Sequence, residues 1–264
     1  MKNQEYVLSL SYGKDSLACL GAIEELGLPL DRIVHAEVWA TDTIHADLPE
    51  MVEFKKKADK IILDRYGIKV EHIRSKWSFE SHFYQPYIYW NTRIANLSKN
   101  GIYGFPIRVS MWCNSRLKVS ALNNAQKNAT AVYIGIASDE PERFHNLNEK
   151  KRSPLVEAGW TEEMCRKWCE DNDLLSPIYT TATRGGCWFC PNQCVNQLRL
   201  LRKNYPELWQ LFLKWDKDSP VSFRSDGHTV HDFDKRFEAE EKGLVPADRK
   251  FRWNMLAHPN RERR

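Results

Sequence analysis

The sequence has no long apolar run, and no stretch approaches the roughly 20 residues that a membrane-spanning helix needs. Its first residues also lack the apolar segment of a secretory signal. Both absences favour a cytoplasmic protein without a membrane partner. The seven cysteines are an odd number, which argues against a complete set of disulfides. In a reducing compartment, crowded cysteines indicate metal or redox chemistry instead.

A strong charge of one sign is also absent. The net charge of +4 is too small to indicate nucleic-acid binding by itself. Basic residues do gather at one end, where a single acid, Glu262, lies among Arg249, Lys250, Arg252, Arg261, Arg263 and Arg264. This basic tail is a candidate contact for a nucleic-acid backbone, although most such tails are solvated chain ends.

Four apolar segments predict the strands of a sheet. They comprise residues 6–10, 33–39, 68–73 and 131–136, with helical patterns between them at residues 16–26 and 49–66. Strands that alternate with helices are joined by right-handed crossovers. The sequence therefore predicts an α/β fold with a mostly parallel twisted sheet flanked by helices. In such sheets, ligands bind outside the carboxyl ends of the strands.

The rest of the chain departs from this alternation. Residues 76–112 are rich in aromatic side chains and are interpreted as an insertion or lid. Beyond residue 150 no further strand is expected, and helices are predicted at residues 161–172 and 195–215. We therefore expect an α/β domain at residues 1–150 and a mostly helical, cysteine-containing subdomain at residues 151–264.

A polar turn, Ser11-Tyr12-Gly13-Lys14-Asp15-Ser16, follows the first predicted strand. It does not fit a Walker A loop, because Leu8 stands at the position of the first glycine and Asp15 follows Lys14. The N–H groups of a tight turn and a helix N-terminus nevertheless form an anion site. Lys14 would add positive charge, and Asp15 would cap the helix or hold magnesium. An ordinary strand-to-helix turn explains the glycine and the cap but not the whole set.

Three cysteines, Cys187, Cys190 and Cys194, lie within eight residues, directly after Gly185-Gly186. A site rich in thiolates suits zinc or an iron–sulfur cluster, and both normally take four ligands. Cys113, at the head of a helix predicted near residue 114, is the best fourth candidate. The alternative for Cys187 and Cys190 is a buried reduced pair. Three further cysteines, Cys19, Cys165 and Cys169, lie on predicted helices and are interpreted as core.

Four stretches in order resemble motifs of the PP-loop ATP pyrophosphatases, in particular their phosphoadenosine-phosphosulfate (PAPS) reductase-like branch. "SYGKDS" is similar to the S-x-G-K-D-S signature, "ATDTIHADLPEM" to the loop after the second strand, and "IGIASDEPER" to a G-x-R-x-x-E-S-x-x-R stretch. The stretch from "SPLVEAGW" to "GGCWFCP" resembles the end of the domain. Together they cover residues 6–195.

Some positions depart from the family pattern. Tyr12 replaces a small residue, Ile44 stands where glycine often follows the Asp-Thr pair, and Ala137 replaces an arginine. The chain has no E-C-G-x-H segment and no cysteine after Cys194. Because that segment carries the attacking cysteine of the reductases, its absence argues against a sulfonucleotide (PAPS or APS) reductase, which we keep as an alternative.

The resemblance implies a PP-loop, HUP-like fold in which residues 1–150 bind the nucleotide. It also implies ATP cleavage between the α and β phosphates with Mg²⁺, giving an adenylated substrate for sulfur transfer. DNA phosphorothioation sulfurtransferases are the most similar branch, and they carry a [4Fe–4S] cluster. A cluster held by Cys113, Cys187, Cys190 and Cys194 is therefore expected, with Zn²⁺ as the alternative. Another alternative is a non-catalytic nucleotide- and nucleic-acid-binding partner in a modification or defence complex.

The expected partners are an adenine nucleotide, a nucleic-acid substrate and a cysteine desulfurase or other sulfur donor, and a homodimer is a further option. Lys14 and Asp15 are the candidate catalytic residues. The candidate nucleotide-binding residues are Ser9, Ser11, Tyr12, Gly13, Lys14, Asp15, Ser16, Asp42, Gly135 and Arg143.

Asp42 and Arg143 have structural alternatives, and Asp139 and Glu140 are further candidates. Asp42 would contact ribose or metal, or only cap its loop, and Arg143 would reach a phosphate or pair with Glu140. Asp139 and Glu140 would assist a metal or orient the substrate. Near the C-terminal end, His228, His231, Asp232 and Asp234 could bind metal, but a solvated polar loop is favoured.

Overall fold

The computed structural model describes residues 4–87, 101–106, 111–145, 147, 149–180 and 185–257. The chain forms two compact units, Met1–Phe79 with Trp112–Cys187, and Glu80–Met111 with Trp188–Arg264. This division differs from the predicted boundary after residue 150, because the segment that follows that boundary adds a strand and two helices to the first unit. Among the described residues, no helix is both long and apolar enough to cross a membrane.

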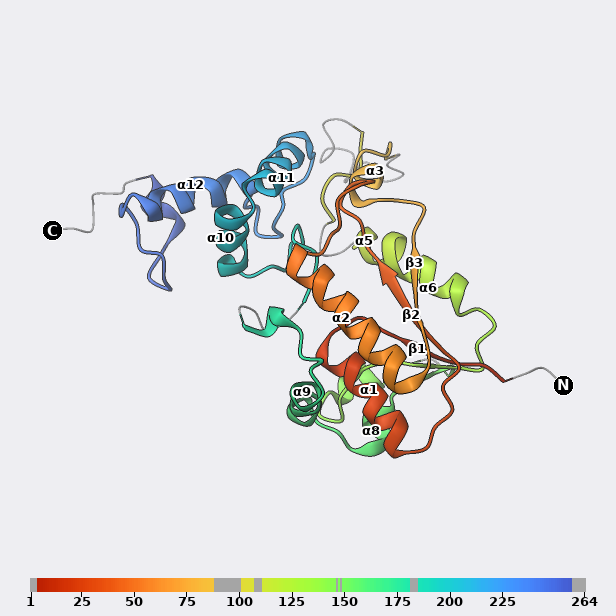
Figure 1. Cartoon of the computed structure of the whole chain (residues 1–264). Coiled ribbons are helices and arrows are strands. Elements are labelled where there is room, and N and C mark those ends of the chain that lie inside the picture. Colours follow the sequence, from red (N-terminus) through yellow and green to blue (C-terminus); the bar gives the residue numbers. More distant parts are fainter. Residues whose placement is uncertain are drawn as a thin grey trace. The chain divides into compact units, whose positions relative to one another are not determined.

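The first unit is built on a parallel sheet with the strand order β3-β2-β1-β4-β5, and Figure 1 labels β1, β2 and β3 of this sheet. The strands are β1 (Tyr6–Ser9), β2 (Arg32–Glu37), β3 (Val70–Arg74), β4 (Ala131–Tyr133) and β5 (Lys151–Arg152). The predicted α/β class with a mostly parallel sheet is confirmed. The chain moves from β1 outward to β3 and then returns to the other side of β1, so the strand order reverses between β1 and β4. Ligands of open α/β sheets bind at such a point.

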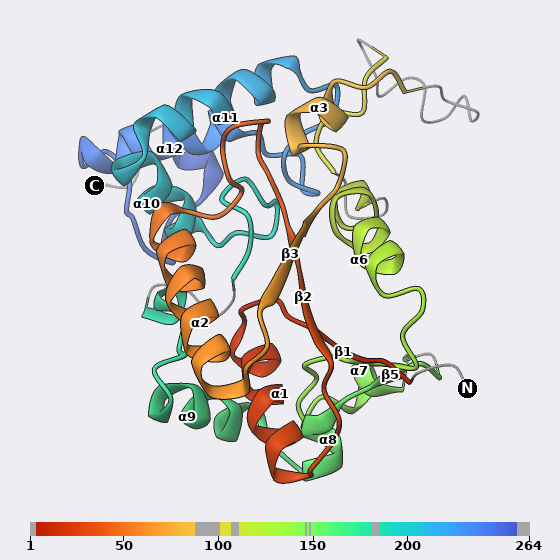
Figure 2. The same ribbon diagram turned by 45° about the vertical axis from the view of Figure 1, so that its right-hand side comes forward.

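Helices cover both faces of this sheet. One face packs against α1 (Lys14–Glu25), α2 (Pro49–Tyr66), α8 (Pro154–Ala158) and α9 (Glu162–Asp171). The opposite face packs against α6 (Ser120–Ala125), as Figure 2 shows. Neighbouring strand residues alternate between the two cores: Leu8 contributes to the first and Val7 to the second. The remaining helical segments of this unit are α5 (Trp112–Asn114), the π-helix Ser115–Val119, α7 (Pro141–Phe144) and the 3₁₀ turn Pro177–Thr180.

The second unit is mostly helical, as predicted for the C-terminal part of the chain. Its helices are α10 (Val195–Asn204), α11 (Pro206–Asp218), α12 (Val230–Glu241) and the 3₁₀ turn Trp253–Leu256. Most of α3 (Phe79–Phe83) also belongs to it. Aromatic rings fill its core: Trp188 and Trp215 are stacked with centroids 5.4 Å apart, and Trp188 meets Phe212 edge-on at 5.9 Å.

Three predictions about local structure were wrong. The helix predicted at residues 195–215 is two helices, because Pro206 has no N–H and begins α11 while Tyr205 leaves the helical conformation. The polar loop predicted around His228 is largely the first turn of α12, where Thr229 and Asp232 form a capping box. A strand, β5, was missed beyond residue 150, since its two polar residues carry no apolar signal.

The predicted lid and the basic tail are described only in part. Within residues 76–112 the structure describes α3 and a bridge between Pro86 and Ile102, while residues 88–100 and 107–110 lie outside the described residues. In the tail, Arg249, Lys250 and Arg252 are described, and residues 258–264 are not. Nucleic-acid contact by the tail therefore stays a prediction.

Candidate functional site

The polar turn after β1 is held in shape by the hydroxyl of Ser16. This Oγ accepts from the Ser11 N–H at 3.1 Å, lies 2.9 Å from the Ser11 hydroxyl, and donates to the Gly13 carbonyl at 3.0 Å. Ser16 is buried at the start of α1. Its predicted role as a donor to the nucleotide is therefore accompanied by a structural role in the loop.

Tyr12 bends the loop through a left-handed conformation, with φ of 57°. Only a small fraction of non-glycine residues adopt positive φ, and the surrounding contacts must stabilise it. The ring of Tyr12 is buried, and its hydroxyl bonds to Asp59 and lies 3.1 Å from His72 Nε2. The departure from a small residue at this position is thus explained by a side chain that anchors the loop to α2 and β3.

The N-terminus of α1 has the features of an anion site. Gly13 is the N-cap and supplies no side-chain cap, so the first-turn N–H groups lack an intrahelical acceptor. The Lys14 N–H donates to the hydroxyl of Tyr179 at 3.0 Å. Backbone N–H groups and the positive end of the helix dipole favour a phosphate here.

Gly13, in this turn, and Gly135, which packs against the start of α1, should respond differently to substitution by alanine. Gly13 has φ −78° and ψ 156°, which any residue adopts, and an added Cβ would lie 3.5 Å from the nearest atoms. An added Cβ at Gly135 would lie 2.5 Å from the Ser16 backbone nitrogen. We expect Gly13→Ala to change the free energy of unfolding by less than about 1 kcal/mol, and Gly135→Ala to lower it by about 1–3 kcal/mol. Urea denaturation measures both.

The Gly13→Ala variant also tests the anion site. If Gly13 is present so that a phosphate can approach the backbone, Gly13→Ala should bind ATP at least about tenfold more weakly by calorimetric titration, or about 1.4 kcal/mol. Wild-type affinity in a folded Gly13→Ala protein would show that no phosphate approaches this glycine. Gly135 packs against the start of α1, which gives it a packing role. Its predicted contact with the nucleotide stays a prediction.

A cavity of about 240 Å³ opens at the carboxyl end of β1, within the first unit. Four of the predicted nucleotide-binding residues line it, namely Ser9, Ser11, Tyr12 and Gly13. Lys118 of the π-helix and Gly185, Gly186 and Cys187 line it too. The loop and the first of the clustered cysteines, far apart in sequence, therefore share one cavity.

Sequence reasoning missed a polar network that lines this cavity. The Lys55 ammonium lies 2.9 Å from His35 Nε2 and 2.5 Å from an Asp47 carboxylate oxygen, and His35 Nδ1 lies 2.9 Å from the Leu10 carbonyl. Burial and the neighbouring Lys55 hold the pKa of His35 well below its ordinary value. The ring is thus neutral, donating from Nδ1 and accepting at Nε2. A histidine within the apolar segment of β2 was the available signal.

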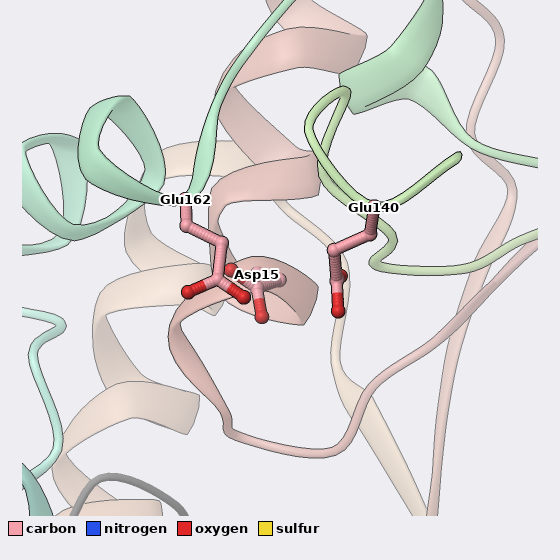
Figure 3. A group of neighbouring side chains, drawn as sticks. All are labelled: Asp15, Glu140 and Glu162. Carbon is pink, nitrogen blue, oxygen red and sulfur yellow. The ribbon is translucent and has the colours of Figure 1, made fainter. Parts of the chain in front are cut away.

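The two predicted catalytic residues, Lys14 and Asp15, lie in a cluster of charged side chains beside the loop. Ligand oxygens of Asp15, Glu140 and Glu162 all lie within 4.8 Å of one another, and Figure 3 shows the three side chains converging. The Lys14 ammonium lies 2.7 Å from Asp15 and 3.1 Å from Glu162. Lys14 and Asp15 are not among the described residues that line the cavity.

The electrostatics of this group suit a cation. Burial raises the pKa of Asp15, and the charges of Glu162 and Glu140 raise it further, against the opposing effect of Lys14. Burial lowers the pKa of Lys14, but its hydrogen bonds to Asp15 and Glu162 outweigh this effect and the pKa is raised. Three carboxylates in mutual range are the oxygen ligands that Mg²⁺ takes. The residues therefore fit the expected magnesium.

The anchor of Tyr12 should make stability depend on pH through His72. A hydrogen bond to Asp59 raises the pKa of His72, with further help from Glu37 and against the effect of burial. The ring of His35 lies edge-on to that of His72, with centroids 5.4 Å apart, and the Lys55 ammonium lies over the ring of Tyr12. Since the folded pKa lies above the unfolded one, protonated His72 stabilises the fold fully below the unfolded pKa, and this stabilisation is lost as pH rises through the folded pKa.

We therefore expect His72→Gln to lower the free energy of unfolding by up to about 1 kcal/mol near pH 6, and by less near pH 9. Urea denaturation of both proteins at the two pH values measures the difference. An equal effect at both values would mean that the charge on His72 does not stabilise the fold.

Two other predicted contacts lie outside the cavity. Asp42 is exposed and lies 3.4 Å from the guanidinium of Arg74, and Arg143 pairs with Glu140 at 2.6 Å. The ion pair proposed as the alternative for Arg143 is thus formed. Asp139 accepts hydrogen bonds from the Glu162 N–H at the start of α9. Neither Asp42 nor Arg143 is among the described residues lining the cavity.

The predicted metal ligands are divided between the two units. Cys113 (in α5) and Cys187 lie in the first unit, and Cys190 and Cys194 lie in the second. The four thiols are exposed or partly exposed, and no disulfide forms among the described residues. Cys19, Cys165 and Cys169 are fully buried, which confirms their interpretation as core. Four accessible reduced thiols are a donor set that fits an iron–sulfur cluster or zinc, and their joint coordination stays a prediction.

Comparisons with known proteins add little to this description. No family model matches the chain, and no curated protein matches it. One solved structure that it resembles is "U34-tRNA thiolase NcsA from Methanococcus maripaludis with its [4Fe-4S] cluster". The two are 15% identical over 90% of this chain and 74% of that chain, with a TM-score of 0.40. A likeness at this level carries no conclusion about activity or site residues.

Proposed function

We propose that this chain is a PP-loop ATP pyrophosphatase that adenylates an acceptor for sulfur transfer. The observation that carries the proposal is the shared cavity: the anion-binding turn at Gly13 and the thiol of Cys187 line the same space at the end of β1. A nucleotide phosphate and a thiol that carries sulfur or binds metal can therefore be held in the same cavity. The motif resemblance supplies the family and the position of bond cleavage.

The chain's own residues divide the first step among them. The acceptor oxygen attacks the α-phosphorus of ATP, and the bond to the β-phosphate oxygen breaks, releasing pyrophosphate. The turn at Gly13 and the first N–H groups of α1 hold the departing phosphates. Lys14, which pairs with Asp15 and Glu162, has a flexible four-carbon stem that would let its ammonium reach the phosphates. Asp15, Glu140 and Glu162 would hold Mg²⁺, which would supply neutralising charge to the pyrophosphate.

In the second step a sulfur nucleophile displaces AMP from the adenylated acceptor, so that a carbon–oxygen or phosphorus–oxygen bond is exchanged for a bond to sulfur. Cys113, Cys187, Cys190 and Cys194 would hold a [4Fe–4S] cluster that delivers or activates this sulfur. The motif resemblance to DNA phosphorothioation sulfurtransferases makes a nucleic acid the first acceptor to test. A cysteine desulfurase or another sulfur donor is then the required partner.

Anaerobically purified protein with ATP and separate nucleic-acid and small-molecule acceptors tests the proposal. We expect pyrophosphate release with one acceptor class, and, when a sulfur donor is added, release of AMP and incorporation of sulfur into that acceptor in equal amounts. Metal analysis with an absorption spectrum identifies the metal, because a four-thiolate cubane contains about four irons per chain. Failure to release pyrophosphate with any acceptor would contradict the proposed activity.

A further inference from the structure

In the second unit, the loop from Cys190 to Cys194 is fixed at both ends. Trp188 and Phe189 precede it and are buried among the aromatic rings, where Trp188 stacks on Trp215. At its other end Cys194 is the N-cap of α10, and its N–H donates to the Gln197 side chain at 3.0 Å. Within the loop, the Gln193 N–H donates to the Cys190 carbonyl at 3.0 Å. The loop is therefore a defined turn between two anchors.

Arg224 closes this turn from a distant part of the sequence. Its two terminal nitrogens donate to the backbone carbonyls of Pro191 and Gln193, which both lie between the two cysteines. Its guanidinium packs over the rings of Phe223 and Phe233, at 5.0 and 5.4 Å from their centroids. A planar fork with two donors and stacking on aromatic rings is a geometry that lysine cannot reproduce.

The charge of Arg224 lacks a direct counter-charge. Among residues 185–257 and the other described parts of the chain, no carboxylate forms an ion pair with it, and its buried Nε has no hydrogen-bond partner. The groups that favour its charged form are Asp226, Cys190 and Cys194, while burial opposes that form and lowers its pKa. Holding a partly buried cation without a paired anion is costly. Two of the three groups that favour the charged form are thus thiols, which become anions when they bind metal.

We propose that Arg224 is a positioning residue for the cysteine site, fixing the backbone between Cys190 and Cys194 and supplying a counter-charge to their thiolates. The inference rests on the metal site of the proposed function, but not on ATP cleavage. It applies equally to iron and to zinc, because both are held by thiolates. It predicts that Arg224 matters to metal affinity even though it does not touch the metal.

Binding of Co²⁺ to the full-length, metal-free chain tests this role, because thiolate coordination gives Co²⁺ a charge-transfer absorption. We expect Arg224→Gln to weaken Co²⁺ binding by about 10- to 100-fold, the usual effect of losing a group that orients metal ligands. Arg224→Lys keeps the charge but not the two-pronged hydrogen bonding, so its affinity should fall between the two. The rate at which a chelator removes Co²⁺ should increase from the wild type to Arg224→Lys and then to Arg224→Gln.

Arg252→Gln is the matched control. Arg252 also lies in the second unit and donates to two backbone carbonyls, but these belong to Arg249 and Phe251 and not to the loop from Cys190 to Cys194. The Arg252→Gln variant should bind Co²⁺ with the affinity of the wild type. Circular dichroism and thermal melting of the metal-free proteins show whether each variant folds, and Arg224→Lys carries the test if Arg224→Gln does not fold.

Wild-type Co²⁺ affinity and chelator release in a folded Arg224→Gln protein would overturn the inference. It would also fall if the wild type shows no thiolate absorption with Co²⁺. Pyrophosphate release from ATP by the wild type is measured separately. A protein that binds Co²⁺ through Arg224-dependent thiolates yet never cleaves ATP would therefore refute the proposed activity and leave the role of Arg224 intact.

Discussion

Replacing Lys14 with methionine should reduce pyrophosphate release from ATP by about 100- to 1,000-fold, the effect of removing one group that stabilises transition-state charge. Lys14 lies within the turn proposed to bind phosphate, and its ammonium pairs with Asp15 and Glu162. Methionine keeps the length of the stem but removes the charge. The initial rate of pyrophosphate release at saturating ATP and Mg²⁺ measures the effect.

Lys56→Met is the matched control for this experiment. Lys56 is exposed on α2 and pairs only with Glu53, three residues earlier on the same helix, among the described residues. It should cleave ATP at the wild-type rate. Substitution of Lys14 also leaves Asp15 and Glu162 without the cation that pairs with both, so urea denaturation should accompany the assay. A folded Lys14→Met protein with wild-type turnover would remove Lys14 from the catalytic site.

Replacing Cys187 with serine should lower metal affinity by more than about 100-fold, because loss of a ligand exceeds the 10- to 100-fold effect of losing a group that orients one. Cys187 is the clustered cysteine that lines the cavity with the turn at Gly13. We expect sulfur incorporation to be lost with the metal while ATP still binds. Metal content, sulfur in the product and calorimetric ATP titration measure the three effects.

Cys165→Ala separates this effect from a general response to losing a cysteine. Cys165 is fully buried on α9, and burial raises the pKa of its thiol to about 12, so it does not form a thiolate at neutral pH. This variant should keep its metal and its sulfur transfer, at some cost in stability. Equal metal loss in both variants would contradict a ligand role for Cys187.

The features of the fold that were predicted correctly have local signals. Apolar segments of β-branched and aliphatic residues mark β1, β2 and β4, and the polar turn beginning at Ser11 follows β1 directly. In contrast, β5 is only Lys151 and Arg152, whose pairing with β4 depends on tertiary contact. The break between α10 and α11 did have a signal in Pro206, which commonly begins a helix.

The candidate site was predictable only where its residues lie in one continuous stretch of the sequence. The turn from Ser11 to Ser16 is contiguous, and four of the predicted residues reach the cavity. The network of His35, Asp47 and Lys55 joins β2, the following loop and α2, and no single stretch of sequence marks it. Glu162 likewise meets Asp15 only because α9 packs against α1. Such convergence is set by packing and not by spacing along the chain.

The position at which ATP is cleaved tests the central claim most directly. Phosphorus-31 NMR of ATP incubated with the wild-type protein, Mg²⁺, an active acceptor and a sulfur donor distinguishes the products without any label. We predict AMP and pyrophosphate in equal amounts, with both reduced in Lys14→Met. ADP and inorganic phosphate, formed by the wild type at a rate that Lys14→Met reduces, would show that the turn at Gly13 serves cleavage of the terminal phosphate and would contradict the proposed function.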